Sequence, residues 1–228
     1  MKRKAAKRRL LKSRWFRWLA AILLLPYVLT LVYIIVPPPS TLMLADIATL
    51  HWPKRDWVPI SRMAPVLVRS VIVAEDSAFC SHTGFDWKQI ERNLDKAIDG
   101  KRYGGASTIT QQTVKNLFLW NGRSWVRKVI EAPITLWMEL VLSKRRILEI
   151  YLNTAEWGPH IYGVGAASRH HFGTDATSLS ASQASLLAAT LPNPKVRRPS
   201  RPTAFMKSAA GVIAGRASAH RADITCLY

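Results

Sequence analysis

The sequence has only two cysteines, Cys80 and Cys226, and no Ser-x-x-Lys motif. It also has no long alternation of apolar and polar residues and no internal repeat, which argues against extensive β-structure and against a repeat architecture. Two cysteines can form a bridge in an oxidising compartment. One of them lies in a polar motif and the other in a segment without a clear pattern, so we expect free thiols. The missing Ser-x-x-Lys motif excludes the serine nucleophile that this motif supplies in some acyl-transfer enzymes.

Charge is missing from residues Trp18–Val36. Nineteen residues of helix span roughly 28 Å, close to the thickness of the hydrocarbon layer of a bilayer. Pro26 lies inside this run, and proline is tolerated in membrane helices. A cleaved signal peptide is the alternative, but the run is long for one, and Pro37-Pro38-Pro39 stands where small residues would mark a cleavage site. We therefore predict a transmembrane helix over residues 18–36.

Acidic residues are absent before Asp46, whereas nine lysines and arginines precede Trp18. The positive-inside rule predicts that residues 1–17 form a basic cytoplasmic segment and that the chain after residue 36 lies across the membrane. The formal charge of +19 fits anionic lipid or a phosphorylated substrate. Nucleic acid is not an expected partner of a domain outside the cytoplasm.

The remaining chain divides into a membrane-proximal linker at 37–60, a domain at 61–203 and a C-terminal tail at 204–228, which carries little signal. Apolar spacing and capping residues predict a mainly α fold for the domain. The expected helices are 61–76 with Ser61 as cap, 86–100 with an apolar stripe, 107–116 with Ser107 as cap, 125–142, 144–153, and one opened by a capping box at Ser180–Gln183.

Polar residues concentrate in Glu75–Gly84 and Gly104–Gln112, between apolar helical segments. Dense polar groups in such surroundings are costly unless they bind something, which indicates a site. Glu75 ends an apolar helix, so desolvation and the neighbouring Asp76 should raise its pKa and suit it to act as a general base. The alternative is a helix-end acid paired with an arginine.

Five segments together carry a family resemblance: Glu75–Gly84, Gly105–Gln112, Arg127–Glu131, Lys144–Asn153 with Gly158, and Ala184–Pro194. In this order and spacing, across roughly residues 45–203, the chain resembles the family-51 peptidoglycan glycosyltransferases, and most of all their monofunctional, single-span bacterial form. The resemblance implies a lysozyme-like helical glycosyltransferase domain behind one transmembrane helix in the bacterial inner membrane, with the catalytic domain in the periplasm.

The implied activity is a transferase reaction in cell wall biogenesis. The growing lipid-linked glycan is transferred onto lipid II with inversion to a β-1,4 bond, and undecaprenyl diphosphate is released. Glu75 would be the base, and Glu131 a second catalytic carboxylate that orients cations or helps a metal. The implied substrate-binding residues are Asp76, Phe79, His82, Ser107, Thr108, Gln111, Gln112, Lys115, Asn116, Arg123, Arg127 and Lys128. Asp76, Phe79 and His82 would hold Glu75 and its loop in place.

Other residues receive supporting roles. Glu149 and Asn153, four apart on one helical face, are expected to be structural supports that touch the cleft. The apolar side chains Leu117, Phe118, Leu119, Trp120 and Trp125 are expected to touch membrane lipid, with a buried core as the alternative. No cofactor is certain, and a divalent cation, Mg or Mn, at the diphosphate remains open. Other cell-wall synthesis and division proteins are possible partners.

Two other readings of the same residues stay open. A lytic transglycosylase or muramidase of the same fold would cut glycan, although lytic enzymes typically show Glu-Ser where this chain has Glu75-Asp76. A non-catalytic assembly protein would not need both glutamates and the cations. His170-His171 lacks the third ligand of a zinc site. Pro133 within its helix, and Ile130 where some relatives have lysine, depart from the family pattern.

Overall fold

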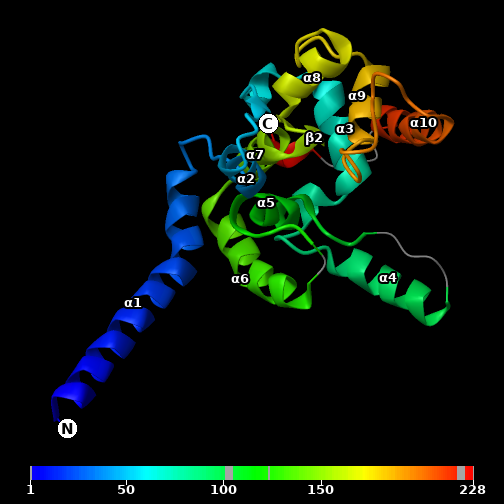
Figure 1. Ribbon diagram of the computed structural model, residues 1–228. Coiled ribbons are helices and arrows are strands. Elements are labelled where there is room, and N and C mark those ends of the chain that lie inside the picture. Colours follow the sequence, from blue (N-terminus) through cyan, green and yellow to red (C-terminus); the bar gives the residue numbers. More distant parts are fainter. Residues whose placement is uncertain (1, 101–104, 123, 220–223, 228) are drawn as a thin grey trace.

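The computed structural model of this chain describes residues 2–100, 105–122, 124–219 and 224–227, and this part is mainly helical, as the sequence predicts (Figure 1). Its helices are α1 (Lys2–Val32), α2 (Thr41–Ala48), α3 (Pro65–Glu75), α4 (Trp87–Ile98), α5 (Ile109–Phe118), α6 (Trp125–Val141), α7 (Lys144–Thr154), α8 (Val164–Phe172), α9 (Ala181–Ala188) and α10 (Ala204–Ser218). Short 3-10 helices are η1 (Ile60–Arg62), η2 (Phe79–Ser81) and η3 (Thr225–Leu227).

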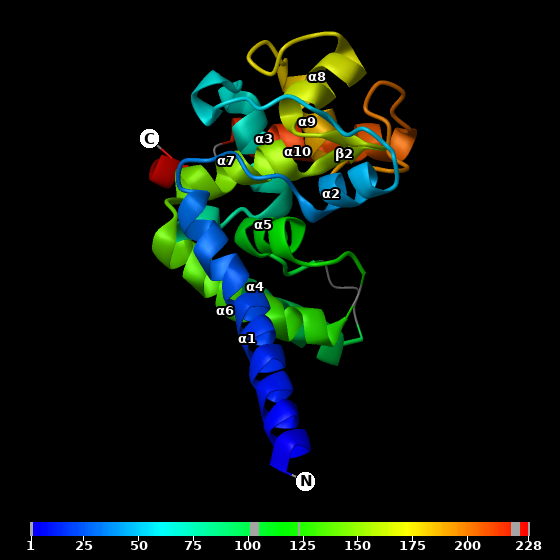
Figure 2. The same cartoon turned by 60° about the vertical axis from the view of Figure 1, so that its left-hand side comes forward.

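Helix α1 projects away from the other helices, and the N-terminus lies at its far end (Figures 1 and 2). Its segment Trp15–Val32 is long and apolar enough to cross a bilayer. The helix ends at Val32, four residues earlier than expected, because the chain turns before the three prolines that follow. Trp137 Nε1 of α6 donates to the carbonyl of Tyr27 at 3.1 Å, which fixes the C-terminal part of α1 against the domain.

A small sheet of β1 (Lys54–Arg55), β3 (Ile161–Tyr162) and β2 (Glu156–Gly158) accompanies the helices. Strand β1 runs parallel to β3, and β2 runs antiparallel to it. Strands of two or three residues are too short for an alternating pattern to appear in the sequence, so this sheet was not predicted. It joins the membrane-proximal linker to the segment that follows α7.

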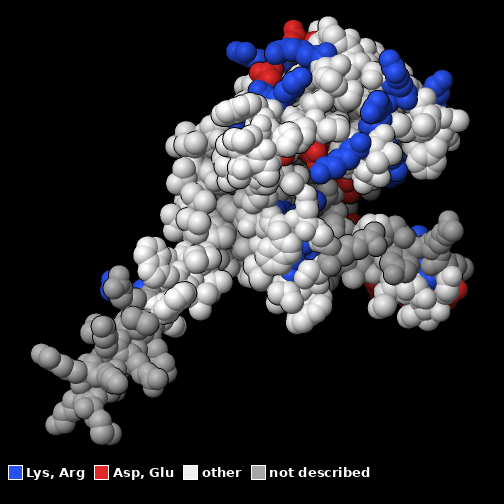
Figure 3. Space-filling model, viewed as in Figure 1, with Lys and Arg blue, Asp and Glu red and all other residues white. Residues whose placement is uncertain are grey.

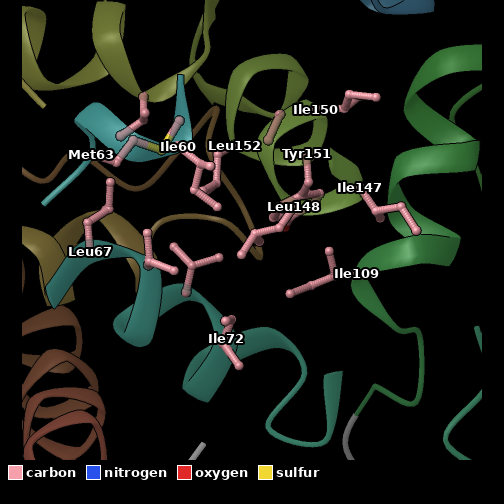
Figure 4. Close-up of a cluster of buried hydrophobic side chains, with 14 of the residues drawn as sticks. Ile60, Met63, Leu67, Ile72, Ile109, Ile147, Leu148, Ile150, Tyr151 and Leu152 are labelled. Atoms are coloured by element: carbon pink, nitrogen blue, oxygen red, sulfur yellow. The ribbon is translucent and has the colours of Figure 1, made fainter. Parts of the chain in front are cut away.

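Helix α7 is the centre of the core. Ile147, Leu148, Ile150 and Leu152 are completely buried, since α7 is covered on several sides. Figure 4 shows these side chains together with Leu67 and Ile72 from α3 and Ile109 from α5. The core therefore fixes the end of α3, where Glu75 lies, relative to the start of α5.

Helix caps differ in detail from the expectation. Thr108, and not Ser107, caps α5, and its side chain and that of Gln111 form a reciprocal capping box. Ala64 precedes α3, which starts at Pro65, so Ser61 is not a cap; it belongs to η1. The capping box at Ser180–Gln183 is confirmed.

The C-terminal segment is more ordered than its sequence indicated. Residues 204–218 form α10, which packs against α3 and α9. Cys80 and Cys226 form a disulfide, so the expectation of free thiols is wrong. The two cysteines are 146 positions apart in the sequence, which hides the pairing, whereas the fold brings η2 and η3 together.

Candidate active site

Glu75 is the last residue of α3, and its carboxylate is partly buried. Gln112 Nε2 donates to Glu75 Oε2 at 2.9 Å, and the hydroxyl of Tyr151 donates to Gln112 Oε1 at 3.0 Å. Burial raises the pKa of Glu75, and Asp76 raises it further, whereas Gln112, Lys115 and Arg197 lower it. The sequence predicted a raised pKa for this carboxyl group. In the structure, desolvation is the larger cause of the shift.

Asp76, next to Glu75, interacts with other groups of the protein. Its Oδ2 accepts the backbone N–H of Ile109 at 3.0 Å, and its Oδ1 lies 3.0 Å from His82 Nε2. A carboxylate at the first turn of α5 accepts a hydrogen bond from a free backbone N–H, and its negative charge interacts favourably with the helix dipole. The fully buried ring of Phe79 lies under Lys144, whose Nζ is 4.6 Å from the ring centroid. Asp76, Phe79 and His82 thus hold the loop after Glu75 in place.

Thr108 and Gln111 also act within the protein. Thr108 Oγ1 donates to the carbonyl of Gly84 at 2.6 Å, and Gln111 Oε1 accepts the N–H of Thr108 at 3.0 Å. Both residues are buried. These bonds occupy groups that the family resemblance gave to sugar or phosphate oxygens, so the structure favours a capping role for the two residues. Their effect is to fix the start of α5 beside Gly84.

Glu131 lies inside α6 and is 1% exposed. Its Oε2 is 2.7 Å from Arg127 Nη1, and its Oε1 is 2.5 Å from Lys128 Nζ. Lys128 Nζ also donates to Ser107 Oγ at 3.1 Å, which links α6 to the loop before α5. The carboxylate therefore holds two cations side by side, as expected of a residue that orients cations.

Lys115 lies between the two glutamates. Burial lowers the pKa of its ammonium group, the cations of Arg127 and Lys128 lower it further, and Glu131 and Glu75 oppose this change. In the part of the chain that the structure describes, Lys115 has no carboxylate within ion-pair distance. Three clustered cations, one of them without a carboxylate partner, form a region of positive potential that suits a phosphate group.

Two cavities adjoin the hydrogen-bonded pair of Glu75 and Gln112. A cavity of about 210 Å³ includes Glu75, Ser107 and Arg216 in its lining, and one of about 260 Å³ includes Gln112, Lys115, Asn116, Tyr151 and Lys195. In Figure 3, acidic atoms appear in a hollow below the α9–α10 region, and lysines and arginines lie along its upper rim. Glu75 therefore borders one cavity, and its hydrogen-bond partner Gln112 borders the other.

The predicted lipid-facing patch is only partly exposed. Leu117 and Leu119 are buried in the core, so lipid contact of these two side chains is contradicted, and Phe118 stacks on Tyr33 with centroids 6.0 Å apart. They are buried because α2 and Tyr33, which directly follows α1, cover this end of α5. Trp120 and Trp125 are 49% and 77% exposed, and their lipid contact stays a prediction.

An apolar surface does exist on α4. Its stripe is helical, as predicted, but Trp87, Leu94 and Ile98 are 70%, 60% and 76% exposed. The sequence shows that this helix is amphipathic, yet it does not show whether the apolar face meets protein or another medium.

Glu149 and Asn153 support the linker. Asn153 makes two hydrogen bonds of 2.8 Å with the backbone of Val58, and Glu149 Oε2 accepts the N–H of Ile60 at 2.9 Å. This agrees with the structural role expected for them. Arg123, which the resemblance assigns to the diphosphate, lies outside the described residues.

Several residues near Glu75 were missed in the sequence. Arg216 reaches the smaller cavity from α10, and Glu156 and Lys195 line the larger one. Lys195 follows the fifth matching segment directly, and this position was a usable signal. No sequence signal pointed to Arg216, because its segment was not expected to pack beside Glu75.

The described residues offer no preformed metal site. They contain no group of three or more His, Cys, Asp or Glu side chains placed to hold a metal ion. Both oxygens of Glu131 already face Arg127 and Lys128. A divalent cation such as Mg²⁺ needs free oxygen ligands, and the two oxygens of Glu131 are already engaged by cations.

Comparisons with known proteins agree with this geometry. A family model described as transglycosylase matches residues 43–218. A protein of Brucella suis is 54% identical over 213 residues, covering 92% of this chain and 95% of that protein. A protein of Rhizobium meliloti is 50% identical, covering 91% and 89%, and one of Agrobacterium fabrum is 49% identical, covering 96% and 98%. All three bear the name biosynthetic peptidoglycan transglycosylase.

Proposed function

The chain belongs to the transglycosylase family of peptidoglycan glycosyltransferases, and we propose that it polymerises lipid II. In this proposal the growing lipid-linked glycan is the donor and lipid II is the acceptor. The product is a glycan longer by one disaccharide, and undecaprenyl diphosphate leaves.

The reaction balances with the residues at the site. Glu75 takes the proton of the acceptor 4-hydroxyl, and the oxygen forms a bond to the anomeric carbon of the donor. The bond from that carbon to the diphosphate breaks, and the diphosphate leaves with the electron pair. Attack from the opposite side inverts the configuration. Lys115, Arg127 and Lys128 stabilise the negative charge that develops on the leaving group.

The observation that carries this proposal is the position of Glu75. It is a carboxylate with a raised pKa, it lines one cavity, and its partner Gln112 lines the next together with Lys115. A base that is partly desolvated accepts a proton more readily than an exposed carboxylate does. In this proposal the acceptor hydroxyl and the leaving diphosphate occupy separate cavities.

Incubation of the purified protein with labelled lipid II in detergent tests the proposal. Long glycan chains that lysozyme digests are the expected product. The same protein is incubated with preformed glycan as a control for cleavage. Cleavage of preformed glycan without polymerisation would favour a lytic enzyme, and no turnover of either substrate would favour a non-catalytic assembly role.

The location of the active site is a further part of the proposal. We infer that α1 is a single-pass anchor, that residues 1–17 are cytoplasmic, and that the domain lies in the periplasm at the inner membrane. The Cys80–Cys226 disulfide supports an oxidising compartment. Trp120, Trp125 and the apolar face of α4 would contact lipid there. Reporter fusions before and after α1 test the orientation, and a cytoplasmic signal from the domain side would contradict it.

A metal requirement and protein partners are proposals as well. A divalent cation, Mg or Mn, could accompany the diphosphate, and polymerisation with EDTA and with each added metal measures this requirement. Other cell-wall synthesis and division proteins are proposed partners, for which in-cell crosslinking is the direct test.

A further inference from the structure

A third cavity lies outside the two that adjoin Glu75. It has a volume of about 470 Å³, and its charged lining comes from β1 and from the segment between α9 and α10. Lys54, Arg197, Arg198 and Arg201 line it, with His170 and His171 from the end of α8. No carboxylate belongs to the residues that line it.

The fold gathers these cations without neutralising them. Arg201 N–H donates to the carbonyl of Arg198 at 3.0 Å, and this turn keeps the two exposed arginines close together. Among the described residues, none of the four cations has a carboxylate within ion-pair distance. Asp56 and Asp175, on the same side as α8, are both bound by Arg169. Cations held together in this way repel one another, and an anionic ligand relieves the repulsion.

The third cavity adjoins the catalytic region at the segment after α9. Pro194 lines both this cavity and the one that contains Lys115, and Lys195 lines the latter. Arg197 Nη1 donates to the carbonyl of Ala189 at 2.6 Å, and its positive charge lowers the pKa of Glu75. A chain-like ligand in the catalytic cavity could therefore extend into the basic cavity within a short distance.

The position of the cavity argues against a lipid headgroup as its ligand. Both ribbon views place the segment between α9 and α10 in the half of the molecule far from the N-terminal end of α1 (Figures 1 and 2). The exposed apolar residues of α4 and of α1 lie in the other half. Anionic groups that reach the basic cavity therefore come from the aqueous side.

We propose that the basic cavity binds the carboxylates of peptides carried by the nascent glycan. This inference rests on the proposed function, because the growing chain is the anionic polymer that such an enzyme would hold. Several weak carboxylate contacts along one polymer add up as multivalent binding. Their consequence is that the product stays bound between additions, so chains grow longer before release.

The experiment compares the double variant Arg198→Ala/Arg201→Ala with the double variant Arg62→Ala/Lys207→Ala. The second pair removes the same charge from exposed positions that line none of the three cavities. Labelled lipid II is polymerised, and glycan length and initial rate are measured by gel. We expect the first variant to make chains roughly threefold shorter at an unchanged initial rate, and the control to match the wild type.

A binding arm identifies the ligand group. Uncrosslinked glycan strands with their peptides, and the same strands stripped by an amidase, are titrated at low and high salt. We expect the wild type to bind the peptide-bearing strands roughly tenfold more tightly, and this difference to vanish in the first variant. Equal glycan lengths in the wild type and the first variant, or equal affinity for both strands, would overturn the inference. Competition by anionic lipid vesicles but not by peptide-bearing strands would also overturn it. A wild type that makes no polymer would instead count against the proposed function.

Discussion

Glu75 and Glu131 are two glutamates at the ends of one cation cluster, and their surroundings differ. Glu75 accepts a neutral hydrogen bond from Gln112 and borders a cavity. Glu131 is 1% exposed and has an ion pair on each carboxylate oxygen. One carboxylate can still accept a proton from a ligand, whereas the oxygens of the other are occupied.

The difference shows how neighbouring acids acquire separate roles. A buried carboxylate without a cation partner has its pKa raised by desolvation and becomes a better base. A buried carboxylate between two cations keeps these cations in position. The matched substitutions Glu75→Gln and Glu131→Gln, which remove one charge each, separate the two roles.

The largest expected effect is on catalysis at Glu75. Glu75→Gln should lower the initial rate of lipid II polymerisation by roughly 10²–10⁴-fold, because the amide cannot take the acceptor proton. The fold should remain intact, as judged by circular dichroism. Polymerisation within threefold of the wild-type rate would remove Glu75 from the role of base.

Next in size is the loss of stability expected for Glu131→Gln. The substitution leaves the buried Arg127 without its ion-pair partner, so the free energy of unfolding should fall by about 3 kcal/mol. Lys128 contributes less to this loss, since its side chain is 42% exposed. Urea unfolding of both Gln variants measures the contrast. Equal midpoints for the two would mean that Glu131 is not a structural centre of the cation cluster.

A smaller effect is expected from the disulfide, which constrains the loop beside Glu75 and does not involve α6. Cys80→Ser/Cys226→Ser should lower the free energy of unfolding by about 2 kcal/mol or more, because the unfolded chain loses a long closed loop. The wild type treated with a reductant should show the same loss, and the variant should not respond to the reductant. A reductant-insensitive wild type would show that the bridge is not formed.

The smallest effect is the dependence of stability on pH at Glu75. Its pKa is raised in the folded protein, so ionisation of this group weakens folding as pH rises through the folded pKa. Glu75→Gln should therefore have a higher thermal midpoint than the wild type at pH 8. The difference should disappear below about pH 4, where the carboxyl group is protonated in both the folded and unfolded states. A variant that is less stable at pH 8 would contradict the desolvation of Glu75.

Local signals in the sequence predicted much of the helical structure. The capping box at Ser180–Gln183 was predicted correctly, and so was the helix over 144–153 within one residue. The cap of α5 was misplaced by one residue, because Ser107 and Thr108 both have hydroxyl groups suited to capping. Only the tertiary contact of Thr108 with Gly84 distinguishes them.

The sequence also predicted part of the candidate site. Glu75, Gln112 and Lys115 come together as expected, because the matching segments are brought together by α3 and α5 packing around α7. Thr108 and Gln111 look like ligand-binding groups in the sequence, and in the fold they cap a helix. The sequence could not show that the apolar stripe of α4 is exposed and that Leu117 is buried, because apolar spacing predicts an apolar face but not what that face contacts.

The sequence by itself determined the apolar helix at the N-terminus, the helical class of the domain and the polar segments that make the site. These follow from local preferences and from spacing along the chain. Tertiary structure alone decided that Cys80 meets Cys226, that α10 delivers Arg216 to the cavity beside Glu75, and that the turn after α9 places its arginines opposite Lys54. Such contacts depend on how the helices pack around α7. Packing brings together residues that are far apart along the chain, and no local sequence pattern predicts which of them will meet.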